Sequence, residues 1–369
     1  MSLTPFKSLY VHIPFCDAKC DYCAFYSETG TDSGLRQKYL HRLEEEFYLR
    51  REQCLPLHSV FLGGGTPSAL SNKELSSLLT LIRTHFQLLE NCEFSLEANP
   101  HSLSAEKLQI ALDHGVNRLS LGVQSFNADL RQRLGRRGDL DSLPQLIAQV
   151  KKTPGMQLNL DLIFNIPGQT LQNWQDDLRM AGDIGPDHLS AYSLSIEEGT
   201  ALAKRWQNNA CDDDFCAFWE ITDEILASYQ LQRYEISNFA QPGKRCLHNF
   251  AIWHGDTYLG CGPAAASFDG INRYTNVSNL QDWLEHAPPN DDILTVEERA
   301  AEILAFGMRC TDGWHCVEFQ QLTGFDPWQL KALELKKLIS LELIEVADKQ
   351  IRPTRKGLLY NDDILEMLI

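Results

Sequence analysis

The sequence lacks any hydrophobic run that approaches the roughly 20 apolar residues of a membrane-spanning helix, so we expect no integral membrane protein. It also lacks a basic excess. A net charge of −17 does not supply the positive footprint that phosphate binding requires, and no nucleic-acid partner is expected. The fifteen residues before Cys16 contain no apolar leader, which argues against secretion and for the cytoplasm. Internal repeats and low-complexity segments are absent as well.

Disulfide bonds are not expected either. The chain has eleven cysteines, but the number is odd, the chain is large, and most of them stand alone in the sequence. Such usage is not typical of a small secreted disulfide scaffold, so we expect reduced thiols. The exception to this scattering is a group of three cysteines near the N-terminus, in the stretch "VHIPFCDAKCDYCAFYS" at 11–27.

Strand and helix patterns alternate through the first two thirds of the chain, which predicts an α/β fold with a parallel sheet covered by helices. Leu40, Leu43 and Phe47 recur with helical spacing, and Ser71 with Glu74 forms a capping box before a helix at 75–82. The predicted strands are 9–13, 59–62, 93–97, 118–123, 158–164 and 188–194.

After about residue 240 the pattern changes. The segment 241–290 is rich in glycine, aromatic and small residues without helical periodicity, so we expect an irregular connector. Beyond it we predict helices at 296–308 and 327–340, a hairpin in "LIEVADKQIRPT", and a last helix from Arg355. The expected parts are therefore a core at 1–240, the connector at 241–290, and a smaller α+β, winged-helix-like domain at 291–369.

Polar residues and glycines gather at the ends of the predicted strands. The glycines at 63–65, Glu97 and Gln124 follow strands, and Asp161 lies inside the fifth strand. The carboxyl ends of parallel strands meet at one edge, where α/β proteins place their sites. Each residue taken singly is explained as well by an ordinary strand end, and the glycine run by a tight turn. A Walker phosphate loop does not fit, because its Lys-Ser/Thr pair is missing.

Cys16, Cys20 and Cys23 have the spacing C-x3-C-x2-C. Thiolates hold iron–sulfur clusters, and three ligands on a [4Fe–4S] cube leave one iron open to a substrate or cofactor. Zinc is the alternative, with His12 or Cys54 as a fourth ligand, although neither has the usual paired spacing. A disulfide would leave one thiol over. The spacing therefore favours an iron–sulfur site.

The cysteine spacing, with Tyr22 directly before the third cysteine, resembles the signature of the radical SAM superfamily. That resemblance implies a partial (β/α)6 TIM-like barrel in which S-adenosylmethionine (SAM) chelates the open iron and can be cleaved to a 5′-deoxyadenosyl radical. It extends to "YVHIPFC", "DYC", "GGGTP", "SLEANP", "GVQSF", "LGRR" and "DLIFNIPGQT". On these motifs, the positions expected to contact SAM are Tyr10, Tyr22, Gly64, Gly65, Thr66, Glu97, Gln124, Arg136 and Asp161.

The order and wording of these motifs are similar to the oxygen-independent coproporphyrinogen III oxidase family, and "CLHNFAIW", "YLGCGPAAASF" and "GMRCTDGW" extend the similarity. The true oxidases have a further cysteine two positions after the third and a longer N-terminal extension. Here that position is Phe25, and only fifteen residues precede Cys16. Both differences favour the heme chaperone branch, HemW. Gly138, where relatives commonly have histidine, departs from the pattern.

The HemW branch carries an H-N-x-x-Y-W motif that is associated with heme. The matching residues are His248, Asn249 and Trp253, with Ile252 in place of the tyrosine. The resemblance implies that His248 could ligate heme iron and that Trp253 could cover the macrocycle. Judged by residue type alone, His248 would be a structural histidine.

The resemblance thus implies a heme chaperone that binds a [4Fe–4S] cluster, SAM and heme and transfers heme to acceptor proteins. The acceptors would include membrane respiratory components, and the cluster would need an electron donor. The alternative is an oxygen-independent coproporphyrinogen III oxidase, which decarboxylates propionates oxidatively. A third interpretation, a DNA-binding winged helix, is disfavoured by the acidic charge. The sequence leaves open whether SAM is cleaved and whether the chain forms a homodimer.

Overall fold

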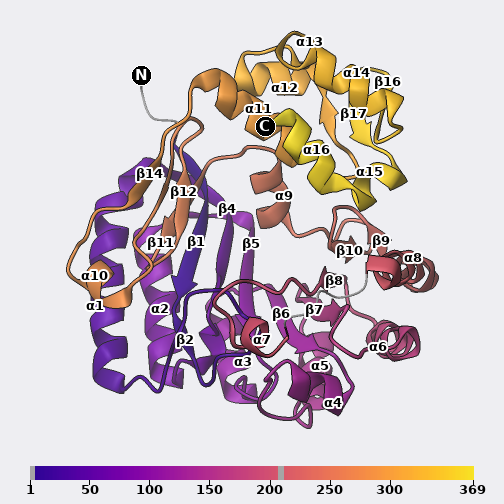
Figure 1. Ribbon diagram of the computed structural model, residues 1–369. Helices are drawn as coiled ribbons and strands as arrows, with labels where there is room; N and C mark the ends of the chain where they lie inside the picture. Colours follow the sequence, from indigo (N-terminus) through magenta and orange to yellow (C-terminus); the bar gives the residue numbers. More distant parts are fainter. Residues whose placement is uncertain (1–4, 207–211) are drawn as a thin grey trace.

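The computed structural model describes residues 5–206 and 212–369. Its centre is a sheet of twelve strands, in which six parallel strands lie side by side in chain order (Figure 1). The six strands predicted for the first two thirds of the chain are all confirmed, with ends that differ by up to five residues. They are β1 (Phe6–Ile13), β4 (Cys54–Gly64), β5 (Leu88–Ala98), β6 (Arg118–Gln124), β7 (Gln157–Phe164) and β8 (His188–Ser193).

Helices connect these strands and lie around the outside of the sheet (Figure 1). The predicted apolar stripe of α1 is buried, and the capping box of Ser71 and Glu74 opens α2. The connecting helices are α1 (Ser33–Arg50), α2 (Asn72–His85), α3 (Ala105–Asp113), α4 (Ala128–Arg133), α5 (Leu143–Lys152), α6 (Leu171–Ile184), α7 (Ala201–Arg205) and α8 (Asp212–Ser228). Short 3-10 helices at Arg51–Gln53 and Pro67–Ala69, and the strands β2 (Phe15–Cys16) and β3 (Glu28–Thr29), complete this part.

The predicted irregular connector at 241–290 is wrong, because this segment folds into regular elements that extend the main sheet. β11 pairs in parallel with β1, and β12 and β13 follow it antiparallel. These strands have only three or four residues each, so their own sequence carries little periodicity, and pairing with the distant β1 decides their conformation. The elements are α9 (Leu247–Trp253), β11 (Tyr258–Cys261), β12 (Ala266–Phe268), β13 (Arg273–Thr275), α10 (Leu280–Leu284) and β14 (Asn290–Asp292).

The described strands leave the sheet open. At one edge lies β14, and at the other lies β9 (Gln232–Arg233), which pairs with β10 (Asn238–Ala240) beside β8. Only the middle of the sheet is parallel, and both flanks are antiparallel. The architecture is therefore α/β with a partial barrel, as predicted.

The C-terminal part has its own hydrophobic core, built around Leu304, Trp314 and Phe319. The predicted hairpin is confirmed and pairs with a third short strand. The predicted helix at 327–340 is two helices, because the backbone at Lys331 (φ −137°, ψ 46°) leaves the helical region. The elements are α11 (Val296–Gly307), β15 (Trp314–His315), α12 (Cys316–Thr323), α13 (Pro327–Leu330), α14 (Ala332–Ser340), β16 (Ile344–Ala347), β17 (Gln350–Pro353), α15 (Arg355–Leu359) and α16 (Asn361–Leu368).

This C-terminal part lies at the end of the sheet where the parallel strands begin, and α9 lies between the two (Figure 1). His254 Nε2 is 3.2 Å from the Gly313 carbonyl oxygen, and the ring centroids of Trp253 and Phe306 are 6.2 Å apart. α9 is therefore attached to the C-terminal part. The carboxyl ends of the parallel strands remain available to the cysteine loop.

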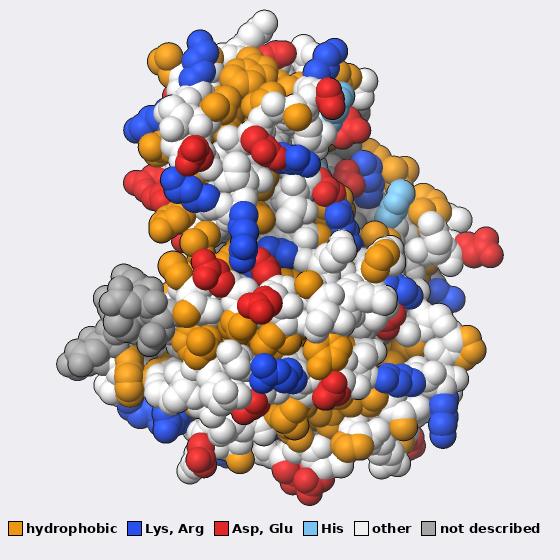
Figure 2. Space-filling view, turned by 90° about the vertical axis from the view of Figure 1, so that its right-hand side faces the viewer, with side chains coloured by type: hydrophobic (Ala, Val, Ile, Leu, Met, Phe, Trp, Pro, Cys, Tyr) orange, Lys and Arg blue, Asp and Glu red, His pale blue; other side chains and the backbone are white. Residues whose placement is uncertain are grey.

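The face in Figure 2 carries acidic and basic side chains mixed together, with no broad field of one sign. Over residues 5–206 and 212–369, no helix combines the length and apolar character needed to cross a membrane.

Candidate functional site

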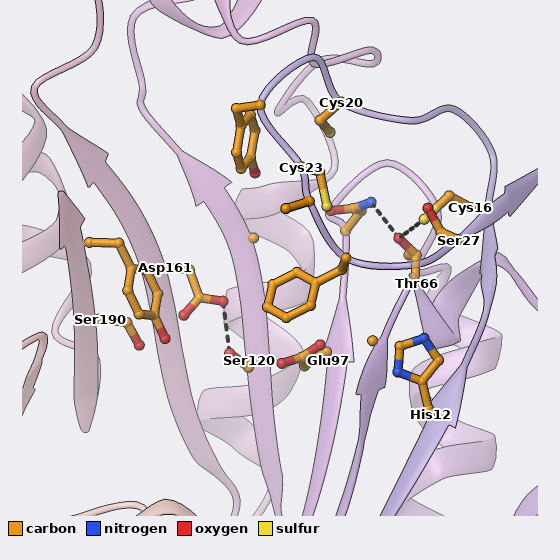
Figure 3. A pocket seen from close by; sticks show the side chains of 18 of the residues that line it. His12, Cys16, Cys20, Cys23, Ser27, Thr66, Glu97, Ser120, Asp161 and Ser190 are labelled. Atoms are coloured by element: carbon orange, nitrogen blue, oxygen red, sulfur yellow. Dashed lines mark hydrogen bonds between the residues drawn. The ribbon is translucent and has the colours of Figure 1, made fainter. Parts of the chain in front are cut away.

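A cavity of about 1070 Å³ lies inside the curved sheet. The cysteine loop, the inner faces of the parallel strands and α9 all contribute to its wall. Twelve of the residues predicted from the sequence line it together: Tyr10, Cys16, Cys20, Tyr22, Cys23, Gly64, Gly65, Thr66, Glu97, Gln124, Arg136 and Asp161. Figure 3 shows the thiols on the loop at one end and Glu97, Ser120 and Asp161 deeper in the pocket.

The cysteine loop leaves the sheet directly after β1. β2 and β3 pair in parallel at its two ends, Phe15 with Glu28 and Cys16 with Thr29, and so close the loop. All three thiols are half-buried and line the cavity. Burial raises the pKa of Cys16 and of Cys23. The loop therefore presents three thiols to one cavity.

The residues considered for zinc do not complete a zinc site. Cys54 begins β4 and pairs with Phe6, while Gly64 ends it and pairs with Ile13, so seven residues of β1, or about 23 Å, separate Cys54 from the start of the cysteine loop. Both ring nitrogens of His12 are engaged, Nδ1 at 3.2 Å from the Tyr10 hydroxyl and Nε2 at 3.0 Å from the Tyr26 carbonyl oxygen. In the described part of the chain, no three His, Cys, Asp or Glu side chains gather closely enough for a single ion.

The glycine run is explained by close packing on three sides. A Cβ on Gly63 would lie 2.7 Å from Glu97 Oε2, and one on Gly64 would lie 2.4 Å from His12 Nδ1. Gly64 also has φ +100°, a conformation that side chains rarely adopt. The amide of Gly65 donates to the Ile13 carbonyl at 2.8 Å, which fixes the run to the end of β1. The run is therefore more than a tight turn.

Thr66 and Asn99 join the glycine loop to the cysteine loop and to Arg136. Thr66 Oγ1 is 3.4 Å from Cys16 Sγ and accepts from Asn99 Nδ2 at 3.2 Å. Arg136 donates to Asn99 Oδ1 at 2.7 Å, to the Gly122 carbonyl, and to Cys20 Sγ at 3.6 Å. Asn99 was missed from the sequence, although it stands within "SLEANP" two residues after Glu97. These hydrogen bonds hold the guanidinium of Arg136 at the thiol end of the cavity.

Glu97 and Asp161 are two of the acids that line the cavity. Burial raises the pKa of Glu97 to about 8, the charge of Asp161 adds to the rise, and the Gly64 amide opposes it. Asp161 accepts hydrogen bonds from Ser120 at 2.9 Å and from Asn159 at 2.8 Å. Near pH 7 the cavity therefore contains a largely neutral Glu97 beside a hydrogen-bonded Asp161.

Several polar residues of this wall were missed from the sequence, among them Arg118, Ser120, Asn159 and Ser190. The signal was alternation: 118, 120, 122 and 124 on β6 all line the cavity, as do 159 and 161 on β7. Only the last members of these inward rows were predicted. Gln124 itself has φ +68°, next to a shift in the pairing of β6 with β7.

His248 lies at the opposite end of the cavity from the thiols, on α9. Glu93 accepts from the amides of Leu247 at 2.9 Å and His248 at 3.0 Å, which fixes the start of this helix. His248 Nδ1 is 2.8 Å from Ser59 Oγ, and its ring centroid is 5.2 Å from that of Phe61. Burial, together with the charge of Arg118, lowers the pKa of His248 to about 3. The imidazole is therefore neutral at physiological pH.

The predicted heme residues are not all brought together. His248 and Asn249 line the cavity, and so does Ile252. Trp253 does not, because it is on the other side of α9, where Arg309 lies 4.4 Å from its ring centroid. Trp253 thus packs against the C-terminal part.

Two family models match the chain: the Radical SAM superfamily over residues 10–181 and the HemN C-terminal domain over residues 294–360. The heme chaperone HemW of Bacillus subtilis is 32% identical, over 97% of this chain and 98% of that protein. HemW of Haemophilus influenzae is 32% identical over 100% and 99%, and HemW of Lactococcus lactis 30% identical over 98% and 97%.

A solved structure shares the fold. Coproporphyrinogen III oxidase (HemN) from Escherichia coli, a radical SAM enzyme, superposes with a TM-score of 0.86 over 99% of this chain and 90% of that one, at 24% identity. The whole-length similarity to three HemW proteins goes further than the fold and shows the family. The chain belongs to the HemW family of radical SAM proteins.

Proposed function

We propose that this protein is a heme chaperone, which holds a [4Fe–4S] cluster, SAM and heme and passes heme to acceptor proteins. The observation that carries the proposal is one continuous cavity of about 1070 Å³, with three thiols at one end and a neutral histidine at the other.

The thiol end is suited to the cluster and to SAM. Cys16, Cys20 and Cys23 would hold three irons, and SAM would take the fourth; when bound, the cluster supplies an electron to the sulfonium. Arg136, already positioned by Asn99, is suited to the SAM carboxylate. Tyr10, Tyr22, Gly64, Gly65, Thr66, Glu97, Gln124 and Asp161 complete the expected SAM contacts.

The histidine end is suited to heme. His248 keeps its ring orientation through Ser59, and the described residues make no hydrogen bond to its Nε2. A neutral imidazole with one nitrogen so oriented is a ready iron ligand, and Asn249 lies beside it on the cavity wall. Trp253 would act differently from the sequence prediction, since it anchors α9 to the C-terminal part.

The partners follow from this function. Heme acceptors would include membrane respiratory proteins, and an electron donor would serve the cluster. We place the protein in the cytoplasm, in agreement with cysteines that are all free within the described ranges. A homodimer stays a proposal.

Coproporphyrinogen III oxidase activity is the second candidate, supported by the shared fold with HemN. Against it, Phe25 stands on the cavity wall where the oxidases have a cysteine. An anaerobic assay with coproporphyrinogen III, SAM and a reductant separates the two. We expect no protoporphyrinogen, and sustained formation of that product would favour the oxidase.

A hemin titration tests the proposal. Wild type, reconstituted anaerobically, should develop a saturable Soret band, and His248→Ala should lose or shift it. His58→Ala is the matched control, because His58 is an exposed histidine on the same strand as Ser59. Failure of the wild type to take up hemin would rule out the chaperone function.

A further inference from the structure

Arg118 is a buried cation whose Nε has no hydrogen-bond partner among the residues that the structure describes. It begins β6, is 3% exposed and lines the cavity. Its Nε makes no hydrogen bond within the described residues, and its neighbours act on it through charge alone. Arginine stays protonated in proteins, and although burial lowers the pKa of Arg118, nearby charges, those of Glu93 and Asp161 among them, raise it. A buried donor that lacks an acceptor still costs free energy. A guanidinium of this kind inside a cavity is suited to bind an anionic ligand.

The carboxylates near Arg118 accept hydrogen bonds from other groups. The two oxygens of Glu93 accept from the backbone amides at the start of α9. Those of Asp161 accept from Ser120 and Asn159. Among the described residues neither carboxylate forms an ion pair with Arg118, and Arg118 itself lines the cavity.

Arg118 and Arg136 lie at different ends of the cavity. Arg136 donates to the carbonyl of Gly122, close to the thiols. Arg118 precedes Gly122 by four residues on β6, which is about 13 Å along the strand. Arg118 also contributes to lowering the pKa of His248, which puts these two residues at the same end. A carboxylate held by Arg136 therefore leaves Arg118 unpaired.

We propose that Arg118 binds a carboxylate of the second ligand in the cavity, a propionate of heme, while Arg136 takes the carboxylate of SAM. The inference rests on the proposed heme chaperone function. Heme bears two propionates, and the other lysine and arginine that line the cavity, Lys19 on the cysteine loop and Arg136, belong to its thiol end. A fork of N–H donors is the group that matches a carboxylate best.

The test compares hemin with hemin dimethyl ester, whose propionates are blocked, in one detergent. Wild type should bind hemin at least about tenfold more tightly than the ester, as expected for a charge-assisted hydrogen bond. Arg118→Met should bind the two ligands equally, and Arg118→Lys should keep part of the preference. Arg179→Met, at an exposed arginine, should behave as wild type.

Four results would overturn the inference. Equal binding of hemin and ester by wild type would refute Arg118 recognition while leaving heme binding intact. A preference that survives in Arg118→Met would do the same. A loss of SAM affinity in Arg118→Met, with its hemin preference unchanged, would assign Arg118 to SAM instead. No hemin binding by wild type would remove the proposed function as well. If Arg118→Met does not fold, the ester comparison on wild type and Arg118→Lys still decides.

Discussion

Thr66 Oγ1 lies 3.4 Å from Cys16 Sγ, so a residue of the glycine loop contacts the first cysteine across fifty positions of sequence. Asn99 donates to the same hydroxyl and accepts from Arg136, which in turn donates to Cys20. The two motifs that resemble a cluster site and a SAM site are therefore one connected unit. A substitution in the cysteine loop should therefore affect the SAM motif, and a substitution in the SAM motif should affect the cysteine loop.

Alanine at Cys16, Cys20 or Cys23 should abolish the cluster, because a cube that already leaves one iron to SAM cannot lose another thiolate. After anaerobic reconstitution, iron and sulfide content and the visible absorption should fall to background. Cys54→Ala is the matched control, since Cys54 lies at the far end of β4 and should keep the full cluster. Equal loss in that control would contradict the assignment.

Gly64→Ala should cost about 2–4 kcal/mol of unfolding free energy, because the methyl group would meet the His12 ring and the backbone has φ +100°. Gly243→Ala provides the comparison, as Gly243 also has positive φ but no atom within 4 Å of its Cβ. It should cost only about 1 kcal/mol. Denaturant unfolding measures both, and equal costs would show that contact with His12 is unimportant.

Glu97→Gln should change how stability depends on pH. The pKa of Glu97 is raised from its ordinary value of 4.5 to about 8 in the folded protein. Between these values the folded state holds one more proton than the unfolded state, so stability falls as pH rises. The glutamine variant lacks this loss. Its stability relative to wild type should increase from pH 5 to pH 8 and level off above. A difference that does not vary with pH would refute the raised pKa.

Asn159→Leu should remove one of the hydrogen bonds that position Asp161. Asn159 donates to Asp161 at 2.8 Å, and its own oxygen lies 2.6 Å from His188 Nδ1. Leucine leaves both groups short of a partner, at a cost of about 1–3 kcal/mol for each unsatisfied buried group. We expect lower stability and weaker SAM binding, measured by thermal unfolding and calorimetry. Gln109→Leu, on the exposed surface of α3, should change neither.

The sequence predicted the core of the fold and most of the cavity because both depend on local signals. Each parallel strand is a short apolar run that ends in glycine or polar residues. The carboxyl ends of such strands lie at the same edge of the sheet. Glu97, Gln124 and Asp161 could therefore be assigned to one site before their distances were known.

Features that depend on distant partners escaped prediction. α9 begins where Glu93, on β5, accepts its first amides, and β11 forms because β1 is beside it. Neither partner is near in the sequence. The side of α9 that faces the cavity follows from the same contacts, which is why His248 lines the cavity and Trp253 packs against the C-terminal part.

Heme transfer tests the central claim most directly. Wild type loaded with hemin, with cluster and SAM present, is mixed anaerobically with a heme-free b-type cytochrome in detergent, and the Soret band is followed as it changes to that of the acceptor. We expect transfer from wild type to be faster than transfer from free hemin in the same detergent, and transfer from His248→Ala to be slower than transfer from wild type. Heme that stays on the protein, or that reaches the acceptor no faster than free hemin, would contradict it.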